Sequence, residues 1–161
     1  MLFRSVLLLV SLRPEQWTKN LLVFAGLLFG GRLMNTEATG LACATFAIFC
    51  ALSSAVYLFN DVTDRVADQQ HPTKRRRPVA SGHLSATVAL MAAGVLGAGG
   101  VAAASLIGAW LGVTAGAYLA LLLLYSATLK NIVIIDVLTI ASGVVLRADR
   151  KSTRLNSSHV K

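Results

Sequence analysis

Residues 41–68, LACATFAIFCALSSAVYLFNDVTDRVAD, decide the fold, because an apolar run of 19 residues leads directly into a cluster of acids. A helix needs about 20 predominantly apolar residues to cross the ~30 Å hydrocarbon core of a bilayer. The stretch therefore predicts a transmembrane helix that delivers acidic side chains to one membrane surface.

The rest of the chain has the same apolar character. Of its 161 residues, 55% are hydrophobic and 14% are charged, and the mean hydropathy is +0.67. A soluble domain of this size could not bury so much apolar surface in one core. Apolar runs predict five crossings, near residues 18–34, 41–60, 85–106, 109–129 and 131–148. We therefore predict an all-α, multi-span transmembrane helix bundle.

Residues 149–161, DRKSTRLNSSHVK, break from this pattern, with four basic residues and no apolar periodicity. Their first eleven residues match a common sequencing adapter translated in one frame. We predict that the segment is not native and that residues 1–148 are the N-terminal part of a membrane domain; a genuine basic tail is the alternative. Without four basic residues and one acidic residue, the formal charge falls from +8 to +5, which requires no nucleic-acid partner.

Basic residues gather on one side of the predicted spans, before the first, after the second and after the fourth. They are Arg4, Arg13, Lys19, Arg65, Lys74, Arg75, Arg76, Arg77 and Lys130. Short cytoplasmic loops carry an excess of Lys and Arg, so this side is predicted to be cytoplasmic. The protein is predicted to lie in the plasma membrane with its N-terminus in the cytoplasm.

The acidic cluster combines Asn60, Asp61, Asp64 and Asp68, whose spacing places them on adjoining stripes of a continuing helix. Three carboxylates on one surface repel one another, and the C-terminal end of a helix disfavours negative charge. Mg²⁺ suits such oxygen ligands, since it binds one or two carboxylates together with substrate phosphates. We predict that Asp61, Asp64 and Asp68 bind the metal, with Asp61 and Asp64 as the catalytic pair.

A basic run follows the acids, and it suits the phosphate oxygens that a metal leaves free. Lys74, Arg76 and Arg77 are predicted to bind a diphosphate, Arg doing so through two parallel hydrogen bonds. Metal and guanidinium together would stabilise charge on a departing diphosphate. The alternative is a solvated helix extension that carries ordinary interfacial charge.

The end of the fourth predicted span places Tyr125, Ser126 and Lys130 at a depth similar to that of the acidic cluster, with Asp136 deeper in the fifth span. An ionisable residue inside a span is a functional hypothesis by default. For Lys130 the alternative is interfacial snorkelling, and for Asp136 it is a buried structural partner.

At these residues the chain resembles the UbiA-type polyprenyltransferase superfamily, whose first acidic motif, Asn-Asp-x-x-Asp-x-x-x-Asp, matches residues 60–68. The stretches RPEQWTKNLLVFA from Arg13, HPTKRRRPVASG from His71 and LYSATLKNIVIIDVLTIASGVVLR from Leu124 resemble its decaprenyl-phosphate phosphoribosyltransferase branch. The resemblance implies about nine helices, of which five are present here, and a second acidic cluster on a later helix. A fragment without that cluster is expected to be inactive.

The resemblance further implies a transferase that moves 5-phosphoribose from phosphoribosyl pyrophosphate to a polyprenyl phosphate, for arabinan assembly in the cell wall. By the same resemblance, Asn60 joins the diphosphate site, Tyr125 and Lys130 line the polar pocket, and Arg13 and Lys19 belong to the same pocket. A homo-oligomer of this chain is a further candidate partner, although the sequence does not give the oligomeric state.

Three other functions remain open. A UbiA-type enzyme could instead transfer a prenyl group from prenyl diphosphate to an aromatic acceptor, using the same acidic motif. A lipid-alcohol phosphatidyltransferase also uses aspartates at the membrane surface, but its Asp-Gly and Ala-Arg signature is missing. A non-enzymatic scaffold or a transporter fragment would use the charged loops only to set its topology.

Overall fold

The computed structural model describes residues 2–128, and all regular structure in this part is helical. Three of its helices are long and apolar enough to cross a membrane: α3 (Thr36–Thr63), α5 (Ala86–Ile107) and α6 (Ala109–Thr128). This confirms the all-α, multi-span class and the second, third and fourth predicted spans. The predicted fifth span at 131–148 and the segment 149–161 lie outside the described residues.

The central helix is α3, which begins where the sequence supplies a cap. The Asn35 side chain accepts a hydrogen bond from the backbone N–H of Ala38 at 2.9 Å, which satisfies one of the free donors of the first turn. At the other end, α3 stops at Thr63 and the short helix α4 (Arg65–Gln70) follows after Asp64. The acidic motif therefore lies across a break between two helices, not along one continuous helix.

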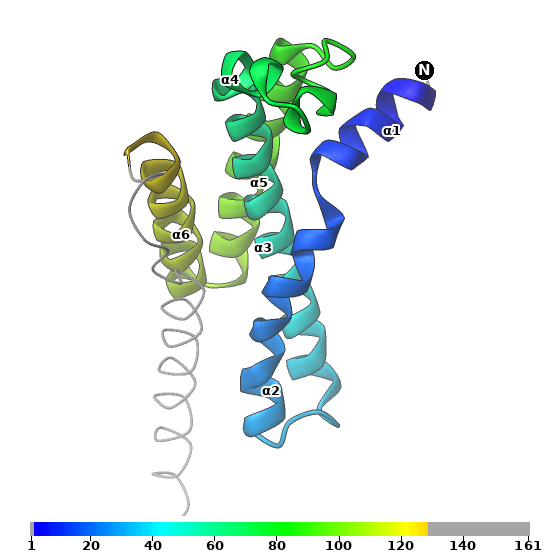
Figure 1. Cartoon of the computed structure of the whole chain (residues 1–161). Coiled ribbons are helices and arrows are strands. Elements are labelled where there is room, and N and C mark those ends of the chain that lie inside the picture. Colours follow the sequence, from blue (N-terminus) through cyan, green and yellow to red (C-terminus); the bar gives the residue numbers. More distant parts are fainter. Residues whose placement is uncertain (1, 129–161) are drawn as a thin grey trace, which may run out of the picture.

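The first predicted span, residues 18–34, takes a different form. A 3₁₀ helix, η1 (Pro14–Phe24), passes into α2 (Ala25–Phe29), and the chain then turns at Gly30 and Gly31. Pro14 explains the early start, because its fixed φ suits a first helical position where its missing N–H costs nothing. A 3₁₀ helix rises about 2.0 Å per residue, so η1 and α2 together extend about 30 Å. Figure 1 shows them running beside α3.

Small residues let α5 pack closely against α3. A Cβ atom added to Gly100 would lie 2.8 Å from Cδ2 of Leu52, whose side chain is fully buried. The cluster around Leu52 also includes Phe49 and Tyr118, whose rings meet edge to face at 5.1 Å. α6 turns back at Gly108 and packs mainly against α5 (Figure 1).

A second apolar cluster holds the loop that follows α4. This loop contains the short 3₁₀ helix η2 (Lys74–Arg76), and its Val79 and Leu84 are buried against Leu58 of α3 and Ala89 of α5. Gly82, with φ 80°, adopts the left-handed conformation that the turn requires. This turn folds the loop back over the end of α3.

The helix α1 (Leu2–Ser11) precedes η1 and diverges from the axis of α3 (Figure 1). Val6, Leu9 and Val10 are exposed on it, while Ser11 is buried and donates to the carbonyl of Leu7 at 3.0 Å. Its exposed apolar side chains suit a position in the membrane interface.

Candidate functional site

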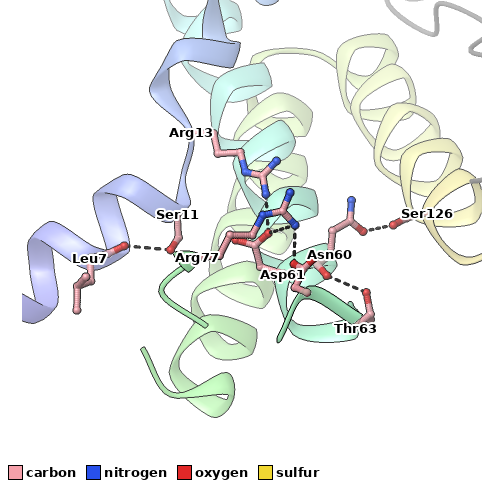
Figure 2. Close-up of polar contacts among 9 residues, drawn as sticks. Leu7, Ser11, Arg13, Asn60, Asp61, Thr63, Arg77 and Ser126 are labelled. Carbon is pink, nitrogen blue, oxygen red and sulfur yellow. Dashed lines mark hydrogen bonds and ion pairs between the residues drawn. The ribbon is translucent and has the colours of Figure 1, made fainter. Parts of the chain in front are cut away.

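The centre of the candidate site is the carboxylate of Asp61, which lies in the last turn of α3 and is only 2% exposed. Its Oδ1 atom accepts a hydrogen bond from Nη2 of Arg13 at 2.6 Å, and Nη1 of Arg77 lies 3.4 Å from the same oxygen. A buried carboxylate is stable when ionised only if it is paired and hydrogen-bonded. Figure 2 shows both guanidinium groups converging on Asp61 from different parts of the chain.

Arg77 also binds a second acid of the motif. Its Nη1 atom donates to Oδ2 of Asp68 at 2.6 Å, and Asp68 is 3% exposed. One guanidinium therefore bridges two buried carboxylates, one from α3 and one from α4. The loop that carries Arg77 is fixed by a further hydrogen bond, from the side chain of Gln69 to the carbonyl of Ala80 at 3.1 Å. The predicted proximity of acids and bases is thus present for this pair of aspartates.

Arg13 is held in an unusual backbone conformation. Its φ of 53° is the one positive φ at a non-glycine residue within residues 2–128. For an L-residue this left-handed region costs about 1–2 kcal/mol, and such residues concentrate at functional sites. The guanidinium lies over the ring of Tyr57, 4.9 Å from its centroid, which adds a cation–π contact. The strained backbone thus directs Arg13 between an aromatic face and a carboxylate.

Asn60 connects the site to α6. Its Oδ1 atom accepts a hydrogen bond from Oγ of Ser126, in the last part of α6, as Figure 2 shows. Its backbone carbonyl accepts from the Thr63 hydroxyl at 3.1 Å. The predicted juxtaposition of the ends of the second and fourth spans is therefore observed, although through Ser126 and not through Tyr125, which is half-buried nearby in sequence.

Several other predicted site residues are exposed or half-buried. Lys19, Lys74 and Arg76 are exposed, and Asp64 is half-buried at the break after α3. Their assignment to substrate or metal stays a prediction. Lys130 and Asp136 lie outside the described residues. His71 is exposed, and its Nδ1 atom accepts hydrogen bonds from the backbone N–H groups of Thr73 and Lys74.

Sequence reasoning missed a set of polar contacts between η1 and α3. Trp17 donates through Nε1 to the Ser54 hydroxyl at 3.0 Å, and the amide of Asn20 contacts Ser53 and Cys50. The signal was present, because polar residues recur at positions 50, 53, 54, 57 and 61, which is the spacing of one helix face. Because leucine and valine residues interrupt this stripe, composition alone predicts an apolar span there.

Comparison with known proteins identifies the family. Residues 20–148 match the UbiA prenyltransferase family, and this region covers most of the chain. The chain belongs to the UbiA prenyltransferase family. The stretch of a UbiA protein described here thus carries the first acidic motif, with Asp61 and Asp68 held by arginines from two other segments.

Individual relatives point to one branch of the UbiA family. The chain is 36% identical over 150 residues to a protein named decaprenyl-phosphate phosphoribosyltransferase from Mycolicibacterium smegmatis, covering 88% of this chain and 46% of that protein. Proteins of the same name from Corynebacterium glutamicum and Mycobacterium tuberculosis are 39% and 38% identical, with 86% of this chain covered in each case and 43% and 47% of those proteins. The chain therefore spans about half the length of these relatives.

UbiA enzymes generally use a divalent metal, so the side chains of the site are compared with the ligands that such a metal needs. Within residues 2–128, no three acidic, histidine or cysteine side chains are arranged to hold a metal ion. Asp61 and Asp68 are brought together by Arg77, whose guanidinium pairs with both carboxylates and balances part of their charge. One or two carboxylates with substrate phosphates are the ligands that Mg²⁺ usually takes. Asp61 and Asp68 would hold a metal that arrives with a diphosphate once Arg77 has moved from these carboxylates to the phosphate oxygens.

Proposed function

We propose that this chain is part of a UbiA enzyme that transfers 5-phosphoribose from phosphoribosyl pyrophosphate to a polyprenyl phosphate. The similarity to three proteins named for a phosphoribosyl transfer to decaprenyl phosphate supports this reaction. The single structural observation that carries the proposal is the pairing of Asp61 and Asp68 with Arg13 and Arg77 at one end of the bundle. Both charge signs that a metal-diphosphate needs are present within one cluster.

In the proposed reaction, an oxygen of the lipid phosphate forms a bond to the anomeric carbon of ribose. The bond from that carbon to pyrophosphate breaks, and pyrophosphate leaves with the bonding electron pair. Asp61 and Asp68 would hold a Mg²⁺ ion, which would supply positive charge to balance the charge on the leaving pyrophosphate. The product would supply arabinan precursors of the cell wall, and the reaction would take place at the cytoplasmic face of the plasma membrane.

Each residue of the cluster has a task in this proposal. Asp61 and Asp68 supply oxygen ligands for the metal, and Asp64 is a third candidate. Arg13 and Arg77 donate to diphosphate oxygens, which Arg binds in a planar, two-point geometry. Asn60 keeps the end of α3 in register with α6 through its hydrogen bond with Ser126. The exposed Lys74 and Arg76 approach the phosphates from the loop that follows α4.

The proposal is tested with membranes that contain the complete reading frame encoding this chain. Labelled phosphoribosyl pyrophosphate is supplied with polyprenyl phosphate, with and without Mg²⁺. We expect labelled lipid only when the metal is present, and at least tenfold less of it for Asp61→Asn. If no lipid is labelled while prenyl diphosphate is consumed with an aromatic acceptor, the family assignment stands and the proposed substrates are wrong.

A further inference from the structure

One hydroxyl group of α3 contacts both sides of the junction between α1 and η1. Oγ of Ser54 donates to the backbone carbonyl of Leu12 at 2.9 Å and accepts from Nε1 of Trp17 at 3.0 Å. A serine hydroxyl has one hydrogen and two lone pairs, so it can make both contacts at once. Ser54 is 1% exposed, which makes both partners costly to leave without a hydrogen bond.

The two residues that Ser54 holds lie on either side of Arg13. Leu12 precedes it directly, and Trp17 follows it one turn into η1. Arg13 itself has a left-handed backbone, so its direction depends on how firmly its neighbours are fixed. By holding both flanks, Ser54 determines where the Arg13 side chain can point.

The target of Arg13 is on the same helix as Ser54. Ser54 and Asp61 are seven residues apart in α3, which is two helical turns, so both project from one face. Tyr57 lies between them on that face and supports the guanidinium. The single helix α3 therefore carries Ser54, Tyr57 and Asp61 on one face. Their spacing along this helix places the Arg13 guanidinium 2.6 Å from Asp61.

We propose that Ser54 and Trp17 are positioning residues that fix the Arg13 guanidinium at the diphosphate site. The inference rests on the proposed function, because it assigns these residues to the geometry of the same site. Neither contacts Asp61 or Asp68, so both act through Arg13. Groups that orient metal ligands typically contribute 10–100-fold to metal affinity, and we expect an effect at the lower end of that range for residues that orient Arg13.

The test measures the binding of radiolabelled pyrophosphate, with Mg²⁺, to the complete purified protein in detergent. Pyrophosphate is common to phosphoribosyl and prenyl donors, so the test does not depend on the donor. We expect Ser54→Ala to weaken binding about tenfold and Ser54→Thr, which keeps the hydroxyl, to restore it. Ser53→Ala is the matched control, since it removes the same group from the next position, where it contacts Asn20 and not the Arg13 junction.

A double-mutant cycle separates positioning from general destabilisation. In an Arg13→Ala background, Ser54→Ala is expected to cause no further loss of pyrophosphate affinity, because the residue it positions is gone. An undiminished loss in that background would overturn the inference. If Ser54→Ala does not fold, Trp17→Phe replaces it in the same double-mutant cycle. The expected loss of pyrophosphate affinity is then smaller, because Ser54 still bonds to Leu12.

Two other outcomes distinguish this inference from the proposed function. If the wild-type protein binds Mg²⁺-pyrophosphate and Ser54→Ala binds it equally well, the positioning role is wrong and the diphosphate site stands. If the wild-type protein does not bind pyrophosphate at all, the proposed diphosphate site fails, and the positioning role falls with it.

Discussion

At the residue scale, the carboxylate of Asp61 is the shared counter-ion of two arginines, Arg13 and Arg77. Asp61→Asn keeps the shape of the side chain but removes a buried counter-ion from the half-buried Arg13 and Arg77. Removing one partner of a buried charge pair typically costs 3–5 kcal/mol. Because Arg77 retains Asp68, we expect a loss of about 3 kcal/mol in the free energy of unfolding. Denaturant unfolding in detergent measures it.

Glu37 provides the control for this substitution. It is an acid of the same helix, exposed in the first turn of α3, where a negative charge gains only about 0.3–1 kcal/mol from the helix dipole. Glu37→Gln should therefore lower stability by less than about 1 kcal/mol. Equal losses for the two variants would show that the charge of Asp61 has no special structural role.

Arg77 and Arg76 are adjacent in sequence but differ in their ion pairs and in their expected contribution to stability. Arg77 bridges Asp61 and Asp68, whereas Arg76 is exposed in η2. We expect Arg77→Gln to lower the free energy of unfolding by about 2 kcal/mol, because Asp68 loses its close guanidinium partner while Asp61 keeps Arg13. Arg76→Gln, measured in the same denaturation experiment, should change stability by no more than about 0.5 kcal/mol. A reversed order would contradict the observed pairing.

The sequence could predict this site only in part, and the two arginines show why. Residues 60–77 contain acids and bases at short separation, so their proximity was predictable from spacing alone. Which arginine turns inward depends on the loop after α4, whose path is set by burial of Val79 and Leu84. Arg13 lies 48 positions from Asp61, and no local pattern predicts that contact.

At the element scale, the three long spans were predictable because length and apolar composition are sufficient for a helix in a bilayer. The 3₁₀ conformation of η1 was not, since its sequence lacks any feature that distinguishes it from an α-helix except Pro14. The break at Asp64 was also missed, because the spacing of the motif fits a continuous helix equally well. Tertiary contacts, which local sequence does not encode, select these forms.

The packing of α5 on α3 gives a prediction at this scale. Gly100→Ala places a Cβ atom 2.8 Å from Cδ2 and 3.1 Å from Cγ of the fully buried Leu52, so the helices must separate or Leu52 must shift. Overpacking of this kind typically costs 1–3 kcal/mol, and we expect a loss of about 2 kcal/mol in unfolding free energy.

Gly99 is the matched control for Gly100, because a Cβ atom there would meet no other atom within 4 Å. Both substitutions gain the same helix propensity, which is up to about 1 kcal/mol for Gly to Ala. Gly99→Ala should therefore be neutral or stabilising in the same assay. If both variants behaved alike, close contact between α5 and α3 at Leu52 would be excluded.

At the scale of the whole molecule, the arrangement of the helices places the charged cluster at one end of the bundle. The start of η1, the end of α3, the loop after α4 and the end of α6 all meet there, through Arg13, Asp61, Arg77 and Asn60 with Ser126. The turn between α2 and α3 lies at the opposite end (Figure 1). Positive residues at the site end predict that this end faces the cytoplasm.

Cysteine labelling tests this orientation without changing any charge. In a Cys43→Ala, Cys50→Ser background, Gln70→Cys places a thiol at the site end and Met34→Cys places one at the opposite end; both positions are exposed. In intact cells, a membrane-impermeant maleimide should label Met34→Cys, and it should label Gln70→Cys only after permeabilisation. Since the diphosphate donor that we propose is a charged, water-soluble metabolite, the cluster must face the compartment that supplies it. Labelling of Gln70→Cys from outside would place the cluster on the exterior and so exclude a cytoplasmic donor.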